Sequence, residues 1–216
     1  MTRALVTGGK SGIGAAVVDK LRALGHEVAV ADLPEVDVRD EDLVREAVAG
    51  VDLLVNAAGI GSTTNVVDTT LEVWENVFAV NARGTFLCCK HAIPGMAARG
   101  GGSIVNVASV AGLVGLRNRA AYCASKGAVI SLTRALAVDH VADGIRVNAV
   151  APGTVDSPWV RRLVEDVGES LDALRARQPL GRLGTPEEIA DAVAYLAAAE
   201  FVTGSVLVID GGLTAA

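Results

Sequence analysis

Tyr122 and Lys126 are the two residues whose spacing most directly suggests acid/base chemistry. They lie four positions apart in a segment with a helical pattern, so both side chains lie on one helix face. An ammonium group near a phenol favours the phenolate and lowers its pKa, which makes tyrosine usable as an acid or base near neutral pH. Ser109 follows a strand-like run, and its hydroxyl could hold a substrate oxygen. Taken singly these features are ordinary: such a pair is usually solvated on a helix, and such a serine is usually a cap.

A second feature, near the start of the sequence, points to phosphate binding. Gly8, Gly12 and Gly14 follow the first strand-like run with the spacing G-x-x-x-G-x-G. Glycine permits a tight turn and lets backbone N–H groups approach a pyrophosphate at a helix N-terminus. Asp32 ends the next strand-like run about 20 residues later, where a carboxylate binds a ribose diol and repels a 2′-phosphate. This pattern predicts NAD rather than NADP, although Lys10 in the turn could help to hold a phosphate.

These residues must be positioned by an alternation of strands and helices. Short runs nearly continuous in Val, Leu and Ile are typical of strands covered on both faces. They are Ala4–Thr7, Val28–Ala31, Leu53–Asn56, Ser103–Ala108, Arg146–Val150 and Ser205–Ile209. Helical patterns lie between them, at 12–24, 40–49, 69–98, 119–141 and 185–199. The alternation predicts an α/β protein with a Rossmann-like, doubly wound parallel sheet, and residues 1–216 read as a single domain.

Two segments interrupt this alternation. Between Val28–Ala31 and the short apolar fragment Val36–Val38 there are too few residues for a crossover through a helix, which needs a dozen or more. We therefore expect the crossover helix after the second strand to be missing and the next strand to be a stub at most. The other segment, 154–184, has amphipathic helical patterns after a strand end, which indicates a functional lid.

Composition and charge exclude several classes of protein. Of the 216 residues, 51% are hydrophobic and 20% are charged, which excludes a disordered chain. The formal net charge of −6 argues against nucleic-acid and anionic-membrane binding, because phosphate affinity comes mostly from clustered Lys and Arg. The uncharged run 100–116 is too short and too polar to cross a bilayer.

The cysteines and histidines suggest no metal site and no disulfide framework. Three cysteines without a C-x-x-C spacing predict small buried side chains in a reducing compartment. The histidines are scattered and have no metal-ligand spacing; they are His26, His91 and His140. The first residues have no signal-peptide pattern. We therefore expect a soluble cytoplasmic protein without a metal.

Taken together and in this order, the motifs resemble the classical short-chain dehydrogenase/reductase family over essentially the whole chain. The matching residues are Thr7-Gly8, Gly12-Ile13-Gly14, Asn56-Ala57-Ala58-Gly59, Asn81, Ser109, Tyr122, Lys126, Pro152-Gly153 and Asp210-Gly211-Gly212. The resemblance implies that Tyr122 transfers the proton, Lys126 lowers its pKa and binds the nicotinamide ribose, and Ser109 positions the carbonyl. Asn81 would hold a helix kink and a water that leads to Lys126.

The resemblance also implies a set of residues that bind NAD. The glycine turn would hold the pyrophosphate, Asp32 the adenosine ribose, and the loops after later strands the adenine and nicotinamide. The implied cofactor residues are Gly8, Ser11, Gly12, Ile13, Gly14, Asp32, Leu33, Asp37, Val38, Asn56, Ala57, Ala58, Gly59, Tyr122, Lys126, Pro152, Gly153, Val155 and Ser157.

Arginines near the reacting end suggest an acidic substrate, because guanidinium groups bind carboxylates with two hydrogen bonds. Arg119 lies one helix turn before Tyr122, and Arg161, Arg162, Arg177 and Arg182 lie in or beside the lid. The sequence is similar to a subgroup that contains type-2 3-hydroxybutyrate and 2-keto-3-deoxy-L-fuconate dehydrogenases. That similarity implies substrate contacts from Ser109, Arg119, Tyr122 and Arg177, with Trp159 reshaping the pocket.

Three functions remain open at this point. The first is an NAD-dependent dehydrogenase of a small hydroxy acid or sugar acid. The second is a 3-oxoacyl-thioester or general ketone reductase of the same family, with an apolar pocket and solvated arginines. The third is a catalytically silent NAD-binding scaffold. The resemblance further implies a homo-oligomer, most often a tetramer, and the missing crossover helix predicts a more open adenine pocket.

Overall fold

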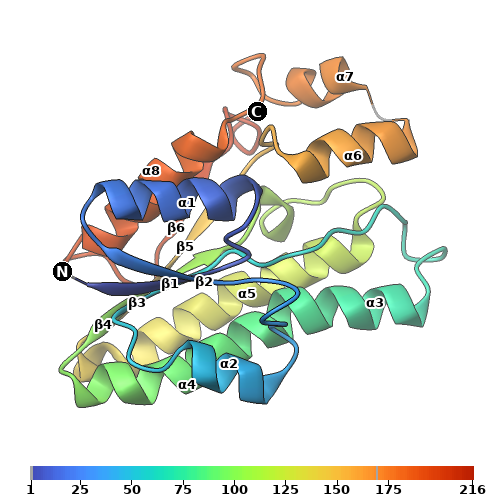
Figure 1. The fold of residues 1–216 in the computed structure, drawn as a ribbon. Helices are drawn as coiled ribbons and strands as arrows, with labels where there is room; N and C mark the ends of the chain where they lie inside the picture. Colours follow the sequence, from blue (N-terminus) through green and yellow to red (C-terminus); the bar gives the residue numbers. More distant parts are fainter. Residues whose placement is uncertain (1, 169) are drawn as a thin grey trace.

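In the computed structural model, which describes residues 2–168 and 170–216, the strands form one parallel sheet (Figure 1). The strands are β1 (Arg3–Thr7), β2 (Glu27–Ala31), β3 (Leu53–Asn56), β4 (Gly102–Val107), β5 (Ile145–Pro152) and β6 (Val206–Ile209). Their spatial order is β2-β1-β3-β4-β5-β6, and every neighbouring pair is parallel. The predicted Rossmann-like fold is confirmed.

Helices cover both faces of this sheet (Figure 1). On one face lie α1 (Gly12–Ala23) and α8 (Pro186–Ala198); on the other lie α2 (Glu41–Ala47), α4 (Thr85–Ala98) and α5 (Ala120–Asp139). Side chains alternate along each strand. In β1, Ala4 and Val6 therefore pack in the core beneath α1 and α8, whereas Leu5 packs in the core on the other face. Each predicted strand and helix is present, with ends displaced by two residues at most.

The sheet ends at β2, and no crossover helix and further strand follow it as they ordinarily do in a doubly wound fold. Residues 32–40 connect β2 to α2 without a helix, which confirms the predicted gap. Val36–Val38 pair with no strand, which agrees with the expectation of a stub at most. Val38 instead packs against the helical segment across from it, where a Cβ on Gly84 would lie 2.8 Å from Val38 Cγ2.

The pattern 69–98 forms a continuous helical stretch with a change of geometry in the middle. It comprises α3 (Leu71–Phe78), a π-helical segment at Ala79–Gly84, and α4. A π-helical turn widens the helix locally and is frequent at functional sites. The kink expected at Asn81 therefore takes the form of a π-helical turn.

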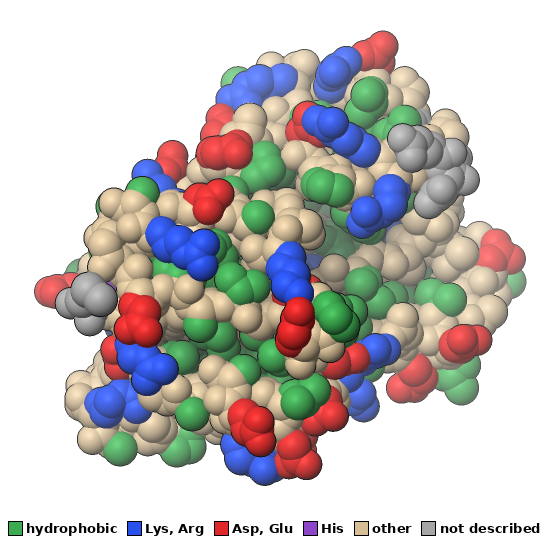
Figure 2. All heavy atoms as spheres, viewed as in Figure 1, with side chains coloured by type: hydrophobic (Ala, Val, Ile, Leu, Met, Phe, Trp, Pro, Cys, Tyr) green, Lys and Arg blue, Asp and Glu red, His purple; other side chains and the backbone are tan. Residues whose placement is uncertain are grey.

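The segment 154–184 extends beyond the carboxyl ends of the strands. It contains α6 (Pro158–Val167) and α7 (Leu171–Ala176), which lie together above the α1 face near the C-terminus (Figure 1). Ser157 caps α6 by accepting a hydrogen bond from the Val160 backbone N–H at 3.3 Å. Figure 2 shows the molecule hollowed beneath these helices, with Lys and Arg side chains near the rim.

Candidate active site

A cavity of about 560 Å³ lies at the carboxyl ends of the strands. Ligands of open parallel sheets bind at this edge. All the predicted cofactor residues except Asn56 line the cavity, and so do the predicted substrate residues Ser109, Arg119, Tyr122, Trp159 and Arg177. Residues that are far apart in the sequence are thus brought to one continuous surface.

The glycine turn is shaped by close approaches of backbone to backbone. A Cβ on Gly14 would lie 2.1 Å from the carbonyl oxygen of Gly8, and a Cβ on Gly8 would lie 2.8 Å from Ala58 Cα. Gly8 also has φ +65° and Gly12 φ +51°, values that favour glycine. The turn is therefore a cradle that a larger residue would fill, and it fits a pyrophosphate at the N-terminus of α1.

Asp32 is fixed beside this turn by hydrogen bonds from the backbone. Its Oδ2 accepts from the Lys10 N–H at 2.8 Å and its Oδ1 accepts from the Leu33 N–H at 2.8 Å. Each carboxylate oxygen keeps a further lone pair. Asp32 can therefore accept hydrogen bonds from a ribose diol while remaining held to the glycine turn.

Asn56 lies outside the cavity, in contrast to the other predicted cofactor residues. Its Nδ2 donates to Asn106 Oδ1 at 2.9 Å and to Cys89 Sγ at 3.4 Å, within the buried sheet. Thr7 links the end of β1 to this segment, because its Oγ1 accepts from the backbone N–H groups of Ala57 and Ala58, each at 3.1 Å. Asn56 supports the sheet, whereas Ala57–Gly59 form the cavity wall.

Ser109, Tyr122 and Lys126 come together at the end of β4 and the start of α5. The Lys126 Nζ lies 5.9 Å from the centroid of the Tyr122 ring and donates to the Val107 carbonyl oxygen at 2.7 Å. The Ser109 Oγ accepts from the Ala111 N–H at 3.1 Å. The three side chains line the same cavity.

The electrostatics of this group differ from the sequence-based expectation. Burial raises the pKa of the Tyr122 phenol, and its hydrogen bond with Ser109 opposes that rise. The expected lowering of the Tyr122 pKa is not seen, because burial dominates. The Lys126 ammonium donates to the Val107 carbonyl in this structure. Burial also lowers the pKa of Lys126 itself to about 8.

Asn81 joins the π-helical segment to the two sides of the site. Its Oδ1 accepts from the Ile60 N–H at 2.8 Å, and its Nδ2 donates to the Ile60 carbonyl at 2.9 Å and to Ser125 Oγ at 3.0 Å. Asn81 does not line the cavity. It fixes the loop after β3 against α5 and so acts on the site by positioning.

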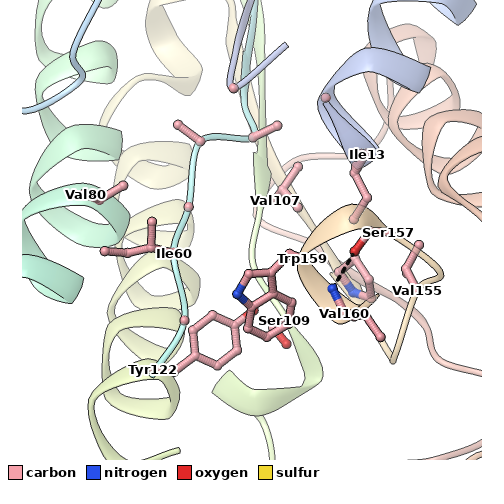
Figure 3. Close-up of a pocket in the computed structure, with 18 of the residues that line it drawn as sticks. Ile13, Ile60, Val80, Val107, Ser109, Tyr122, Val155, Ser157, Trp159 and Val160 are labelled. Carbon is pink, nitrogen blue, oxygen red and sulfur yellow. Dashed lines mark hydrogen bonds between the residues drawn. The ribbon is translucent and has the colours of Figure 1, made fainter. Parts of the chain in front are cut away.

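Trp159, on the first turn of α6, faces the reacting end of the cavity (Figure 3). Its ring centroid lies 6.0 Å from that of Tyr122, with 28° between the ring planes. A Cβ on Gly61 would lie only 2.2 Å from Trp159 Cζ2. That Gly61 makes room for the indole could not be predicted from sequence, because the two residues are almost a hundred positions apart.

The lid arginines divide into two groups. Arg162 and Arg177 line the cavity, as does Arg119 at the start of α5, which is only 8% exposed. Arg161 instead pairs with Asp156 at 2.9 Å and Arg182 with Glu188 at 2.6 Å, outside the cavity lining. Arg175, the fifth arginine of the lid, pairs with Asp172 at 2.9 Å. Two of the five lid arginines therefore lie where a substrate would bind.

Gln178 is a buried polar residue that sequence reasoning missed. Its Oε1 accepts from the Thr154 N–H at 2.8 Å, and its Nε2 donates to the Arg182 carbonyl at 2.5 Å. It thus joins the two ends of the lid segment. No periodic pattern marks it, because its role depends on two loops that meet only in the folded chain.

No group of three or more His, Cys, Asp or Glu residues is arranged to hold a metal ion within residues 2–168 and 170–216. No helix in the same ranges is long and apolar enough to cross a membrane.

The chain is similar to known proteins over nearly all of its length. Residues 35–214 match a family model described as enoyl-(acyl carrier protein) reductase. The chain is 49% identical to inactive 2-(S)-hydroxypropyl-CoM dehydrogenase 2 of Xanthobacter autotrophicus, covering 83% of each. It is 42% identical to cis-4-hydroxycyclohexanecarboxylate dehydrogenase of Sinomonas cyclohexanicum, covering 98% of this chain and 96% of that protein.

Two further comparisons bear on the subgroup and the fold. The chain is 40% identical to 2-keto-3-deoxy-L-fuconate dehydrogenase of Xanthomonas campestris, covering 89% of this chain and 67% of that protein. The solved structure of ElxO with NADP bound has a TM-score of 0.93 at 30% identity, with 100% of each chain covered. The alignment with the Sinomonas protein spans 242 positions, more than the 216 residues of this chain, so that relative contains residues that this chain lacks.

Proposed function

Because this chain belongs to the short-chain dehydrogenase/reductase family, we propose that it interconverts a secondary alcohol and a ketone, with NAD as hydride acceptor. The resemblance stated from the sequence is thereby confirmed. The chain is an oxidoreductase that acts on CH–OH groups. The observation that carries the catalytic assignment is the convergence of Ser109, Tyr122 and Lys126 on a cavity that also contains the glycine cradle.

The reaction divides between cofactor and protein. When bound, NAD supplies the carbon atom that accepts the hydride from the alcohol carbon. In the oxidation direction, the Tyr122 phenolate accepts the hydroxyl proton as the C–H bond breaks and the C=O bond forms. Ser109 donates a hydrogen bond to the same substrate oxygen and so holds it near Tyr122. The Lys126 ammonium lies 5.9 Å from the centroid of the phenol ring and donates to the Val107 carbonyl. If a bound ligand draws the ammonium away from that carbonyl and toward the phenol, its positive charge favours the phenolate.

Asp32 supports the choice of NAD. Its carboxylate stands beside the glycine turn, where it can accept hydrogen bonds from a ribose diol but would repel a 2′-phosphate. The position of Asp32 beside the glycine turn also supports the binding of a dinucleotide, with its pyrophosphate at the turn and its ribose at Asp32.

The substrate that the site supports best is a small hydroxy acid or sugar acid. Arg119, Arg162 and Arg177 line the cavity, and a guanidinium is the group that best binds a carboxylate. The names of two relatives contain a hydroxycarboxylate and a keto acid. The cavity also has apolar lining residues, among them Ile60, Val160 and Leu163. An acidic substrate is nevertheless preferred, because a thioester would leave the guanidinium groups at the cavity unexplained.

Two alternative functions can be separated from the proposed one by a single experiment. The family model's description names an acyl group on a carrier protein, which favours the alternative of a 3-oxoacyl-thioester reductase. A catalytically silent protein is favoured by the word "inactive" in the name of one relative. A screen of hydroxy acids, polyols, cyclic alcohols and 3-hydroxyacyl thioesters, each with NAD and NADP, separates the three functions, since the silent protein would turn over none.

The test of the mechanism is Tyr122→Phe. The variant should lose turnover by at least about 10³-fold, because the proton acceptor is removed. Its dissociation constant for NAD, measured by calorimetry, should stay within about twofold because the ring is retained. Unchanged turnover would refute the assignment of Tyr122, and loss of NAD binding would indicate damage to the fold.

We also propose a cytoplasmic homo-oligomer, most often a tetramer. The three cysteines form no disulfide, which supports a reducing compartment. Large apolar side chains are exposed on α8 and β6 and on α4 and α5, which supports association through these elements. We further propose that residues 154–184 act as a functional lid. The more open adenine pocket stays a prediction.

A further inference from the structure

Two basic residues belong to the two segments that meet at Asp32, the residue that would bind the adenosine ribose. Lys10 belongs to the glycine turn, and its backbone N–H donates to Asp32. Arg39 belongs to the connection 32–40 and lines the cavity. An ammonium or guanidinium beside the ribose is the group that would bind a 2′-phosphate. Whether carboxylates neutralise these two cations therefore affects the choice between NAD and NADP.

Each of these cations is already paired with a carboxylate from the same short connection. The Lys10 Nζ forms an ion pair with Glu35 and donates to the Leu33 carbonyl at 2.9 Å. The Arg39 guanidinium donates to both carboxylate oxygens of Asp37, with Nε–oxygen distances of 3.0 Å. Both Lys10 and Glu35 are exposed, at 48% and 68% of their side-chain area. Exposed pairs add little to folding stability, so the consequence of this one lies in the local charge.

The short connection is what brings Glu35 to the glycine turn. Because no crossover helix follows β2, Glu35 lies three residues after Asp32, and the chain turns back with the Val36 N–H donating to the Asp32 carbonyl at 2.9 Å. Glu35 is thereby within reach of Lys10, which stands on the other side of Asp32. A 2′-phosphate at this point would meet two carboxylates and an ammonium that is already neutralised.

We infer that Glu35 is a second determinant of cofactor choice, which acts by holding the Lys10 ammonium away from a 2′-phosphate. Asp32 repels the phosphate directly, and Glu35 withholds the cation that would otherwise compensate. This inference rests on the proposed binding of NAD at this cavity. It resolves the conflict within the sequence between Asp32 and Lys10, since Lys10 is engaged by Glu35.

The test is a set of binding measurements on cofactor-free protein, by calorimetry at low ionic strength. Every variant carries Asp32→Asn, which removes the first determinant and so makes NADP binding measurable. To this background are added Glu35→Gln, Lys10→Met, or both. Glu35→Gln should tighten NADP binding by about tenfold, because a charge-assisted contact with the phosphate is gained, and leave NAD within about twofold.

The Lys10→Met background separates the proposed cause from a general change of charge. There, Glu35→Gln should change NADP binding by no more than about twofold. Glu46→Gln serves as a matched control, since it removes one exposed carboxylate from α2 and should leave the ratio of NADP to NAD affinity unchanged. An equal effect of Glu35→Gln with and without Lys10, or none with Lys10 present, would overturn the inference. If the natural protein, with Asp32 intact, bound neither cofactor, the proposed function itself would be refuted.

Discussion

Lys126 carries a buried ammonium, so the free energy of unfolding should depend on pH. Only 5% exposed, Lys126 has a pKa lowered by burial from its ordinary 10.5 to about 8. The folded protein therefore binds fewer protons than the unfolded chain between these values. The cost of the buried charge is full below pH 8 and vanishes as the pH rises toward 10.5. A shift of this size corresponds to about 3 kcal/mol against the charged form.

Lys126→Met should therefore be more stable than the natural protein at pH 7. The gain should be about 2 kcal/mol, because the lost hydrogen bond to Val107 offsets about 1 kcal/mol of it. Urea unfolding of the cofactor-free proteins at several pH values checks this. The difference between the two proteins should shrink as the pH rises from 8 to 10. A difference independent of pH, or a less stable variant at pH 7, would contradict the buried charge.

Arg119 is the residue at which the acidity of the substrate can be tested. It lies at the start of α5, one turn before Tyr122, and is 8% exposed. Arg119→Leu should raise KM by about 10–100-fold for substrates with a carboxylate, because a charge-assisted hydrogen bond contributes about 1.5–3 kcal/mol. Neutral alcohols should change by no more than about twofold.

The matched control for that experiment is Arg117→Leu. Arg117 is exposed, lies two residues away and does not line the cavity, so it carries the same charge change without the contact. Its kinetic constants should equal those of the natural protein. If Arg119→Leu raises KM equally for acids and neutral alcohols, the carboxylate contact is refuted and the apolar, thioester-binding alternative gains support.

At the scale of elements, α6 sets the space above the reacting groups. Its buried residues Val160 and Leu163 anchor it, and Trp159 projects from its first turn toward Tyr122. Trp159→Ala should raise kcat/KM for alcohols with a bulky second substituent by at least about tenfold relative to small ones. The removal of the indole opens that space, and one or two methylene groups in a pocket contribute about 1–3 kcal/mol. The measurement is a substrate series of increasing size.

Two variants check that the indole itself is responsible. Gly61→Ala places a Cβ 2.2 Å from Trp159 Cζ2 and so displaces the ring without removing it. It should reproduce part of the change in substrate preference. The sequence has two tryptophans, so Trp74→Phe leaves Trp159 as the single reporter. Its fluorescence should change when substrate binds, and an unchanged spectrum together with an unchanged size preference would refute this position for Trp159.

The elements of the fold could be predicted from sequence because each is determined by local periodicity. Strand–helix alternation and the few residues after Asp32 sufficed for the sheet and for the missing helix. The contacts of loops could not be predicted in this way. Trp159 with Gly61, and Lys10 with Glu35, depend on backbone conformations that carry no period.

Side-chain direction and protonation were the other limits of the sequence. Asn56 was expected in the cofactor site, but it ends β3 pointing into the buried sheet, toward Asn106. The pKa of Tyr122 was expected to fall, because spacing places Lys126 nearby without showing the burial that raises this pKa. Both results depend on how a side chain is oriented and buried at the end of an element.

At the scale of the whole molecule, the proposed oligomer would cover the largest exposed apolar side chains of the last helix and strand. Phe201 is fully exposed, Tyr195 on α8 is 58% exposed, and Val208 on β6 is 38% exposed. Phe86 on α4 and Val138 on α5 are exposed on another part of the surface. Large apolar patches mark association sites in soluble proteins, and these exposed side chains would contribute to such patches. Two separate surfaces would join four copies by two kinds of two-fold contact.

Phe201→Glu should therefore separate a tetramer into dimers that remain associated through α4 and α5. A charge buried without a partner opposes the contact, while the active site lies at the other end of the sheet strands. Light scattering coupled to size-exclusion chromatography gives the mass of each species. Val67→Glu is the matched control, since Val67 is 88% exposed but lies in the loop before α3. A tetramer unaffected by Phe201→Glu, or a natural protein that is monomeric, would refute this surface as an interface. Dimers that keep full turnover would show that no active site needs a residue from across the Phe201 contact.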